Sequence, residues 1–359
     1  MSIVQTSRLF ARAFVSSNMP SNALRARAPL TALALALGSC LLAAPAVAEE
    51  LSVATFLPPQ HHTNAVVFKW LGEELAKRSN GTLSLKVYPG GQLGAGPVQQ
   101  YKRAVEGVAD IVVGVASYTP ELFPKTLLTI PPGKANNSEE LAERFLAAYD
   151  KHFADEFAAV KFLGIGFPAG TSISATKNLS TFASLKGAKI VPYSATTTAL
   201  MDAMGVVPVQ MPVTEVYTGL STGTIDGAIA AHNNMLAPWN WQDVTKFYID
   251  NFPAQFQTVY IVMNKERHKS LSPAHRKIID DLAGKEFTRI TAASFHRADD
   301  VALKAMKANS GKSYQFITVS DAERAKMDAA VAEGMKVIFA AYAAKGISNA
   351  KEIYDAVNK

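Results

Sequence analysis

After residue 50, apolar and polar residues alternate with two periods, one typical of strands and one of helices. Between residues 65 and 78, apolar residues recur every three or four positions and charged residues fill the opposite face, which predicts an amphipathic helix. Asn80-Gly81 then supplies a stop signal. The expected order is strand 51–56, helix 65–78, strand 83–87, helix 99–106 and strand 109–115. This order predicts right-handed crossovers and a parallel sheet.

The same alternation continues to the end of the chain. Thr214 is expected to cap the helix that begins beside it. The expected elements are helix 139–157, strand 160–167, strand 188–192, helix 196–204, strand 206–211, a helix from 214, strand 225–230, strand 258–264, and helical segments at about 273–308 and 320–345. Because no long linker separates two blocks, two α/β lobes with the chain crossing between them fit better than two independent domains.

Residues 1–48 have the layout of a secretory signal peptide. Four arginines lie in a stretch without acidic residues, an apolar run follows from 30 to 42, and Ala46-Val47-Ala48 is an A-x-A cleavage site. The run is shorter than the roughly 20 residues of a spanning helix. We therefore expect cleavage after residue 48 and a soluble periplasmic protein.

Three alternatives concern this leader. It could stay attached as an N-terminal membrane anchor. Leu37-Gly38-Ser39-Cys40 is similar to a lipoprotein cleavage site, which would leave Cys40 lipidated. Because the leading basic region is long, Met19 is an alternative start.

The composition changes once the leader is removed. The whole chain has 359 residues, a formal charge of +6 and one Cys. The leader takes four arginines and that Cys with it, so the remaining 311 residues have a formal charge of +2. A nearly neutral chain does not suggest nucleic acid as a partner. A chain without Cys excludes disulfides and thiolate metal sites and suits an oxidising compartment.

Motifs for catalysis or cofactor binding are missing. Gly311-Lys312-Ser313 ends like a phosphate loop, but Met306 stands where the first glycine is required. His61 and His62 are adjacent, which does not place them on one face for a metal. We expect both on a solvated loop, with a cleft position for one of them as the alternative. No serine stands in a G-x-S-x-G turn. We therefore expect no enzyme activity, cofactor or metal.

Four short motifs occur in an order that resembles a known family. They are Gly90-Gly91-Gln92-Leu93-Gly94, the segment 185–190 (LKGAKI), Glu215-Val216-Tyr217, and the segment 223–227 (GTIDG). Each motif alone is weak, but the ordered set resembles the solute-binding proteins of tripartite ATP-independent periplasmic (TRAP) transporters, of the dicarboxylate-receptor type. The resemblance runs over nearly all of residues 50–345.

This resemblance implies an α/β, two-lobed periplasmic-binding-protein fold with a ligand cleft and long helices at the C-terminus. Lobe I would hold residues 49–169 plus 258–297, and lobe II residues 170–257 plus 298–359. Closure by hinge motion would capture one small solute. The loaded protein, a monomer, would then dock on the small and large membrane subunits of the permease. Glu215 and Tyr217 would start a helix that faces the cleft.

The chain departs from the family where most members bind an organic acid. Those members hold the ligand carboxylate with an arginine, whose planar fork matches it. Here the lysine-containing strand continues as Lys189-Ile190-Val191-Pro192 without an arginine, and a second family arginine is replaced in Gly170-Thr171-Ser172. Burying a carboxylate without a guanidinium is costly unless several neutral donors replace it. Lys186 and Lys189 are the nearest cations, and we expect both to point to solvent.

We therefore expect a small neutral or cationic solute, for example an amino alcohol such as ethanolamine, bound by aromatic rings with Glu215 as counter-charge. The expected ligand-binding residues are Phe56, Tyr118, Phe167, Ser172, Tyr193, Glu215, Asn233, Asn234 and Trp239. One alternative is an organic acid held by Ser172, Tyr193, Asn233 and backbone donors. Others are an exported hydrolase or lyase on the same scaffold and a periplasmic sensor subunit.

Overall fold

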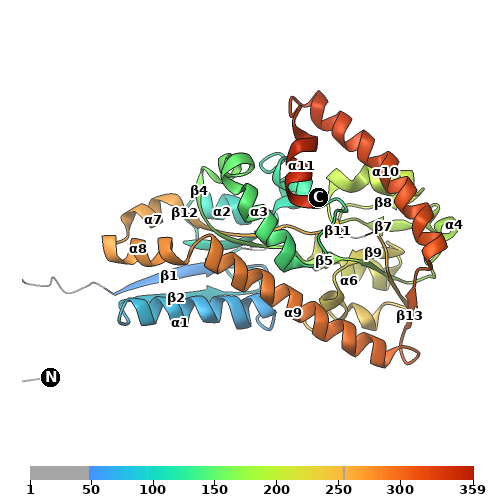
Figure 1. Ribbon diagram of the computed structural model, residues 1–359. Helices are drawn as coiled ribbons and strands as arrows, with labels where there is room; N and C mark the ends of the chain where they lie inside the picture. Colours follow the sequence, from blue (N-terminus) through green and yellow to red (C-terminus); the bar gives the residue numbers. More distant parts are fainter. Residues whose placement is uncertain (1–47, 95, 254) are drawn as a thin grey trace, which may run out of the picture. The chain divides into compact units, whose positions relative to one another are not determined.

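The computed structural model describes residues 48–94, 96–253 and 255–359 (Figure 1). The expected signal peptide, the alternative start Met19 and the lipidation site Cys40 lie outside these ranges, apart from Ala48 at the boundary. In the described ranges no helix combines the length and the apolar character needed to cross a membrane.

The first of two main sheets contains the strands expected near the start of the chain. Its order is β2 (Leu83–Tyr88), β1 (Glu49–Ala54), β3 (Ile111–Val115), β12 (Val259–Asn264) and β4 (Val160–Gly166). β1 is parallel to β2 and β3, as predicted. β12 is antiparallel to both β3 and β4, so the sheet is mixed rather than parallel. All residues of β3 and β12 are buried, which explains their continuous apolar sequences.

Helices cover the faces of this sheet and bury its apolar side chains. The expected helix 65–78 is a π-helical segment, η1 (Thr63–Phe68), followed by α1 (Lys69–Arg78). The other helices of this part are α2 (Gln100–Val105), α3 (Ser138–His152), α7 (Lys265–Ser270), α8 (Pro273–Leu282) and α9 (Lys285–Asn309).

The second sheet has strands that the sequence pattern missed. Its order is β13 (Gln315–Thr318), β10 (Phe247–Asp250), β6 (Ser172–Ala175), β9 (Gly227–Ala230), β7 (Lys189–Val191) and β8 (Val207–Pro208). β6, β10 and β13 were not expected, because each has four residues and mixes polar with apolar positions. The helices of this part are α4 (Phe182–Leu185), α5 (Thr198–Ala203), α6 (Val213–Thr222) and α10 (Asp321–Ala344).

The start of α6 differs from the expectation. The helix begins at Val213, and Pro212 rather than Thr214 occupies the capping position, without a side-chain hydrogen bond. The fixed φ angle of proline suits an extended residue that leads directly into a helix. The expected cap at Thr214 was therefore wrong.

The chain crosses between the sheets more than once, as a two-lobed α/β fold requires. A short antiparallel pair, β5 (Ala169–Gly170) with β11 (Gln255–Phe256), lies on two of these crossings. Helix α9 packs against β4 of the first sheet and also contacts the loop that follows β9 of the second (Figure 1).

The last helix, α11 (Ala350–Asn358), packs mainly against α3. The side-chain amide of Asn358 donates to the carbonyl of Leu128 at 2.8 Å. The end of the chain therefore contacts helices that we assigned to lobe I, although its residues were expected in lobe II. The lobe boundaries themselves stay a prediction.

Candidate functional site

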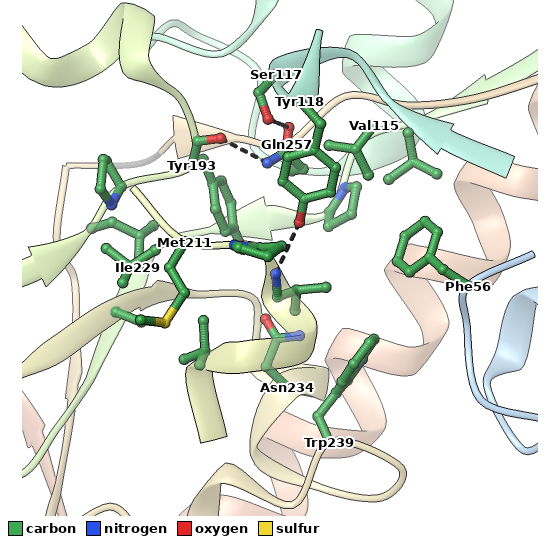
Figure 2. Close-up of a pocket in the computed structure, with 18 of the residues that line it drawn as sticks. Phe56, Val115, Ser117, Tyr118, Tyr193, Met211, Ile229, Asn234, Trp239 and Gln257 are labelled. Carbon is green, nitrogen blue, oxygen red and sulfur yellow. Dashed lines mark hydrogen bonds between the residues drawn. The ribbon is translucent and has the colours of Figure 1, made fainter. Parts of the chain in front are cut away.

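A cavity of about 270 Å³ is lined by residues from elements of both sheets (Figure 2). Ser117 and Tyr118 lie in the short 3₁₀ turn that follows β3, and Tyr193 follows β7. In α/β folds, ligands bind beyond the carboxyl ends of the strands, where these residues lie.

Aromatic and aliphatic side chains form most of the lining. Its aromatic residues are Phe56, Tyr118, Tyr193, Trp239, Trp241 and Phe295, and its polar residues are His61, Ser117, Gln210, Asn233, Asn234 and Gln257. No Asp, Glu, Lys or Arg lines the cavity in the ranges that the structure describes. A cavity of this kind favours a solute with an apolar ring and few polar groups.

The structure brings six of the nine expected site residues together around this cavity. They are Phe56, Tyr118, Tyr193, Asn233, Asn234 and Trp239. Figure 2 shows Tyr118 in the upper part of the view with Tyr193 to its left, Phe56 at the right and Trp239 at the bottom. Contact of these residues with a ligand stays a prediction.

The other three expected residues lie elsewhere. Phe167 is fully buried in the core, with its ring centroid 5.7 Å from that of Phe145. Ser172 is fully buried in β6, and its hydroxyl donates to the carbonyl of Ala230 at 3.0 Å. These two side chains are used for packing and do not line the cavity.

Glu215 was expected to face the cleft but is exposed on the first turn of α6. Val213 and Val216 line the cavity. Since each helical residue turns by about 100°, Glu215 projects away from the face that carries these valines. Tyr217 is 38% exposed and does not line the cavity.

The preferred expectation of a solvated loop was wrong for His61, the alternative of a cleft position is the one that the structure shows, and Ser117 and Gln257 were missed. His61 is 3% exposed and lines the cavity instead of a solvated loop. Burial lowers the pKa of His61 well below its ordinary value, so the ring is neutral. The strand end at residue 115 was the signal available for Ser117. No sequence signal pointed to Gln257, because glutamine is as common on protein surfaces as in binding sites.

Hydrogen bonds connect the two sides of the cavity (Figure 2). The hydroxyl of Tyr118 accepts the backbone N–H of Val213 at 2.9 Å. The amide of Gln257 donates to the carbonyl of Tyr193 at 2.8 Å, and the hydroxyl of Ser117 donates to Oε1 of Gln257 at 3.1 Å. Residues that follow β3 or precede β12 therefore hold residues of α6 and of the segment after β7 around the cavity.

Two buried donors on the lining find no acceptor among the described residues. They are the hydroxyl of Tyr193 and Nε1 of Trp241. Burial raises the pKa of Tyr193 well above its ordinary value, so its hydroxyl keeps its proton. A buried polar group without a partner is costly, and a polar group of a ligand would reduce that cost.

A carboxylate lies directly behind the cavity wall. Asp299 of α9 is 6% exposed, and its Oδ1 accepts the backbone N–H of Asn233 at 2.9 Å and its side-chain amide at 2.6 Å. Burial raises the pKa of Asp299 to about 7, although the bonds from Asn233 oppose this. The Asp299 carboxyl thus fixes the orientation of a residue that lines the cavity.

The missing family arginine is not replaced by a nearby lysine. Lys186 and Lys189 are both exposed, as expected, and neither lines the cavity. In addition, no group of three His, Cys, Asp or Glu side chains in the described parts of the chain is arranged to hold a metal ion.

The chain is similar in sequence to a known family of binding proteins. A family model described as bacterial extracellular solute-binding protein, family 7 (DctP), matches residues 53–341. The chain belongs to this family. The match spans both sheets, and it confirms the resemblance found in the motifs.

One protein with a similar sequence is the outer membrane transporter protein TsaT of Comamonas testosteroni. It is 24% identical over 286 residues, which cover 78% of this chain and 82% of the relative.

Several solved TRAP solute-binding proteins share the fold. One, from a marine metagenome, is described as specific for aromatic acid ligands and was solved with 3-hydroxybenzoate; it is 26% identical with a TM-score of 0.79, covering 87% of this chain and all of that one. Another, from Rhodoferax ferrireducens, holds copurified benzoate; it is 24% identical with a TM-score of 0.79, covering 86% and 96%. A third, from Bordetella bronchiseptica, holds mandelate; it is 21% identical with a TM-score of 0.75, covering 86% and 98%.

These likenesses confirm the two-lobed TRAP binding-protein fold and, at the level of the family, a transport protein rather than an enzyme. Proteins of this class are periplasmic, bind small solutes and work with membrane permease subunits.

Proposed function

We propose that this protein is the periplasmic solute-binding component of a TRAP-type secondary transporter and that it captures a small ring-bearing solute in the cavity described above. The observation that carries this proposal is a cavity of about 270 Å³ with six aromatic residues on its lining and no charged side chain. Its size suits a molecule with one ring. Ring-on-ring contacts and the unpartnered Tyr193 hydroxyl would supply affinity and orientation.

Capture would occur by hinge closure of two lobes. We propose lobe I as residues 49–169 plus 258–297 and lobe II as residues 170–257 plus 298–359. Hydrogen bonds between the two sides of the cavity, such as the one from Val213 to Tyr118, support a closed state held partly by the protein itself. The protein would act as a monomer after cleavage of the signal peptide, and it would deliver the solute to the small and large permease subunits.

The amino alcohol expected from the sequence is not supported by the cavity. An ammonium group would need a counter-charge, but Glu215 points away and none of the described residues that line the cavity is acidic. The solved relatives named above hold aromatic acids, so a ring-bearing acid is the second candidate beside a neutral ring-bearing solute.

A thermal-shift screen of the purified protein, followed by calorimetry, tests this proposal. The panel should contain neutral aromatics, aromatic acids, amino alcohols, dicarboxylates and sugar acids. A ligand present at 100 times its dissociation constant adds about 2.7 kcal/mol of stability. We expect shifts with ring compounds only. Shifts confined to dicarboxylates, sugar acids or amino alcohols would contradict the proposal, and turnover of a bound compound would favour the hydrolase or lyase instead.

A further inference from the structure

A second cavity of about 270 Å³ adjoins the first, and His61 and Asn233 line both. Its walls come from the segment that begins at Gln60, from the loop after Asn233, and from α9, which Figure 1 shows as one long helix. The valines Val66 and Val301 add apolar surface and are 42% and 60% exposed, so this cavity opens to solvent.

One side chain gives this second cavity its charge. Among the residues that the structure describes, Arg297 of α9 is the sole Asp, Glu, Lys or Arg on the lining of either cavity. The two histidines beside it are neutral, because burial lowers the pKa of His61 well below the ordinary range and that of His62 to about 4. The two cavities together therefore present a single positive charge.

The guanidinium of Arg297 has no hydrogen bond or ion pair with any residue that the structure describes. The acids nearest to it in the sequence have other partners. Asp300 lies 3.7 Å from His296, which also contacts Glu139 at 2.7 Å. Asp299 is turned inward to Asn233. Because these acids are paired with other residues, the exposed guanidinium of Arg297 can bind an anion in the cavity.

A second observation on the same wall also points to a ligand. Nδ1 of His62 is hydrogen-bonded to the hydroxyl of Ser294 at 2.7 Å, whereas its buried Nε2 has no partner among the described residues. Because His62 lines the second cavity, a polar ligand group there would meet both a neutral ring nitrogen and the guanidinium.

We propose that the two cavities form one divided site, in which the first holds the ring of the solute and the second holds its anionic group at Arg297. This inference rests on the proposed function and specifies the solute as an aromatic acid with a spacer between ring and carboxylate. Arg297 lies on α9, outside the two segments in which the family's arginines are missing. The ring cavity needs no cation of its own, because the negative charge lies beyond His61 and Asn233.

Calorimetry with matched probes tests this division. The probes are benzoate, phenylacetate, 3-phenylpropionate and 4-phenylbutyrate, each with its neutral amide. We expect the protein to bind at least one acid with a spacer about tenfold or more tighter than its amide, because a guanidinium–carboxylate bond contributes about 1.5–3 kcal/mol. That preference should weaken between 20 mM and 500 mM salt, since the guanidinium is exposed.

Variants locate the charge that recognises the acid. Arg297→Gln should weaken acid binding about tenfold or more and leave amide binding within about twofold. Arg297→Lys should retain part of the preference. Arg289→Gln is the matched control, because Arg289 is an exposed arginine of the same helix that lines neither cavity. It should change neither affinity.

The outcomes separate this inference from the proposed function. Equal binding of acid and amide, or an Arg297→Gln variant that binds the acid normally, would overturn the inference while the ring site stands. Equal losses for acid and amide in Arg297→Gln would also overturn it. Failure of every ring probe to bind would instead count against the proposed ring-bearing solute.

Discussion

The hydroxyl of Tyr118 accepts the backbone N–H of Val213 at 2.9 Å and thereby joins the short 3₁₀ turn that follows β3 to the first residue of α6. Tyr118 follows a strand of the first sheet, Val213 begins a helix in the part that contains the second sheet, and both line the cavity. Burial raises the pKa of Tyr118 to about 12, so the hydroxyl stays protonated across the physiological range. It can therefore also donate a hydrogen bond while it accepts the one from Val213.

Replacing Tyr118 with Phe should favour opening of the cavity. The N–H of Val213 would lose its partner, and a buried group left unsatisfied costs about 1–3 kcal/mol. We expect a lower free energy of unfolding in urea and weaker binding of any ring ligand, by about three- to tenfold. Tyr217→Phe on the exposed face of α6 is the control and should change neither quantity. A Tyr118→Phe protein with unaltered affinity and stability would refute this role.

Trp239 provides a test of the ring cavity that does not depend on charge. Its indole lies edge-on to the ring of His61, at a centroid distance of 5.9 Å. Trp239→Ala should lower the affinity for acid and amide probes alike, by tenfold or more, because it removes a large apolar contact surface. Trp70→Ala, outside the cavity and packed on Phe287, is the control for general destabilisation. If both variants bind the probes normally, the ring of the ligand lies outside this cavity.

The dependence of stability on pH should reveal Asp299. Its pKa is about 7 in the folded protein and near 3.9 in an unfolded chain, so between about pH 4 and pH 7 the folded state keeps a proton that the unfolded state loses. Its contribution to the free energy of unfolding is therefore greatest below pH 4 and falls as the pH rises to 7. The fall is about 4 kcal/mol at most, because one pKa unit corresponds to about 1.4 kcal/mol.

The Asp299→Asn variant isolates that contribution. We expect the stability of the normal protein relative to Asp299→Asn to decrease steadily from pH 4 to pH 7 in urea titrations. Asp300→Asn, next to it on the exposed side of α9, is the control. A difference between the normal protein and Asp299→Asn that stays constant with pH would show that Asp299 does not titrate in this range.

Glu49, the first residue after the expected cleavage site, should have the opposite dependence. Its carboxylate accepts hydrogen bonds from Arg267 at 2.8 Å and His275 at 3.0 Å. Burial opposes ionisation of Glu49, but these bonds outweigh it and lower the pKa of Glu49. Its contribution is therefore present above its unfolded pKa and is lost as the pH falls through the lowered folded pKa.

Glu49→Gln should destabilise the protein by about 1 kcal/mol or less at pH 7, as partly exposed ion pairs do. The difference should disappear toward pH 3. Glu50→Gln, at an exposed neighbouring position, serves as the control. Equal effects of the two substitutions at pH 7 would argue against the pairing of Glu49.

Strands were predicted most accurately where the sequence is continuously apolar. The β3 segment 111–115 and the β12 segment 259–264 are buried throughout and were expected within a few residues. The four-residue strands β6 and β10 were missed, since their pattern is too short to separate from a loop. The antiparallel direction of β12 could not be predicted, because it depends on where the chain returns from the second sheet.

The site was predicted where position along an element determined it. Tyr118 and Tyr193 line the cavity because they follow strand ends. The prediction that Glu215 faces the cavity was wrong. The resemblance implied only the position of its helix, whereas the direction in which Glu215 points depends on how α6 packs. Arg297 gave no signal at all, because an arginine on the polar face of a long helix is ordinary until its surroundings are known.

The position of β12 has a consequence for how the chain folds. β12 lies between β3 and β4, yet it is synthesised after nearly all of the second sheet. Until residue 264 has been made, β3 and β4 both lack their shared partner, and the first sheet stays open along its middle. The first sheet of a chain exported as proposed would thus be completed only after its later residues have been made, which suits export as an extended polypeptide.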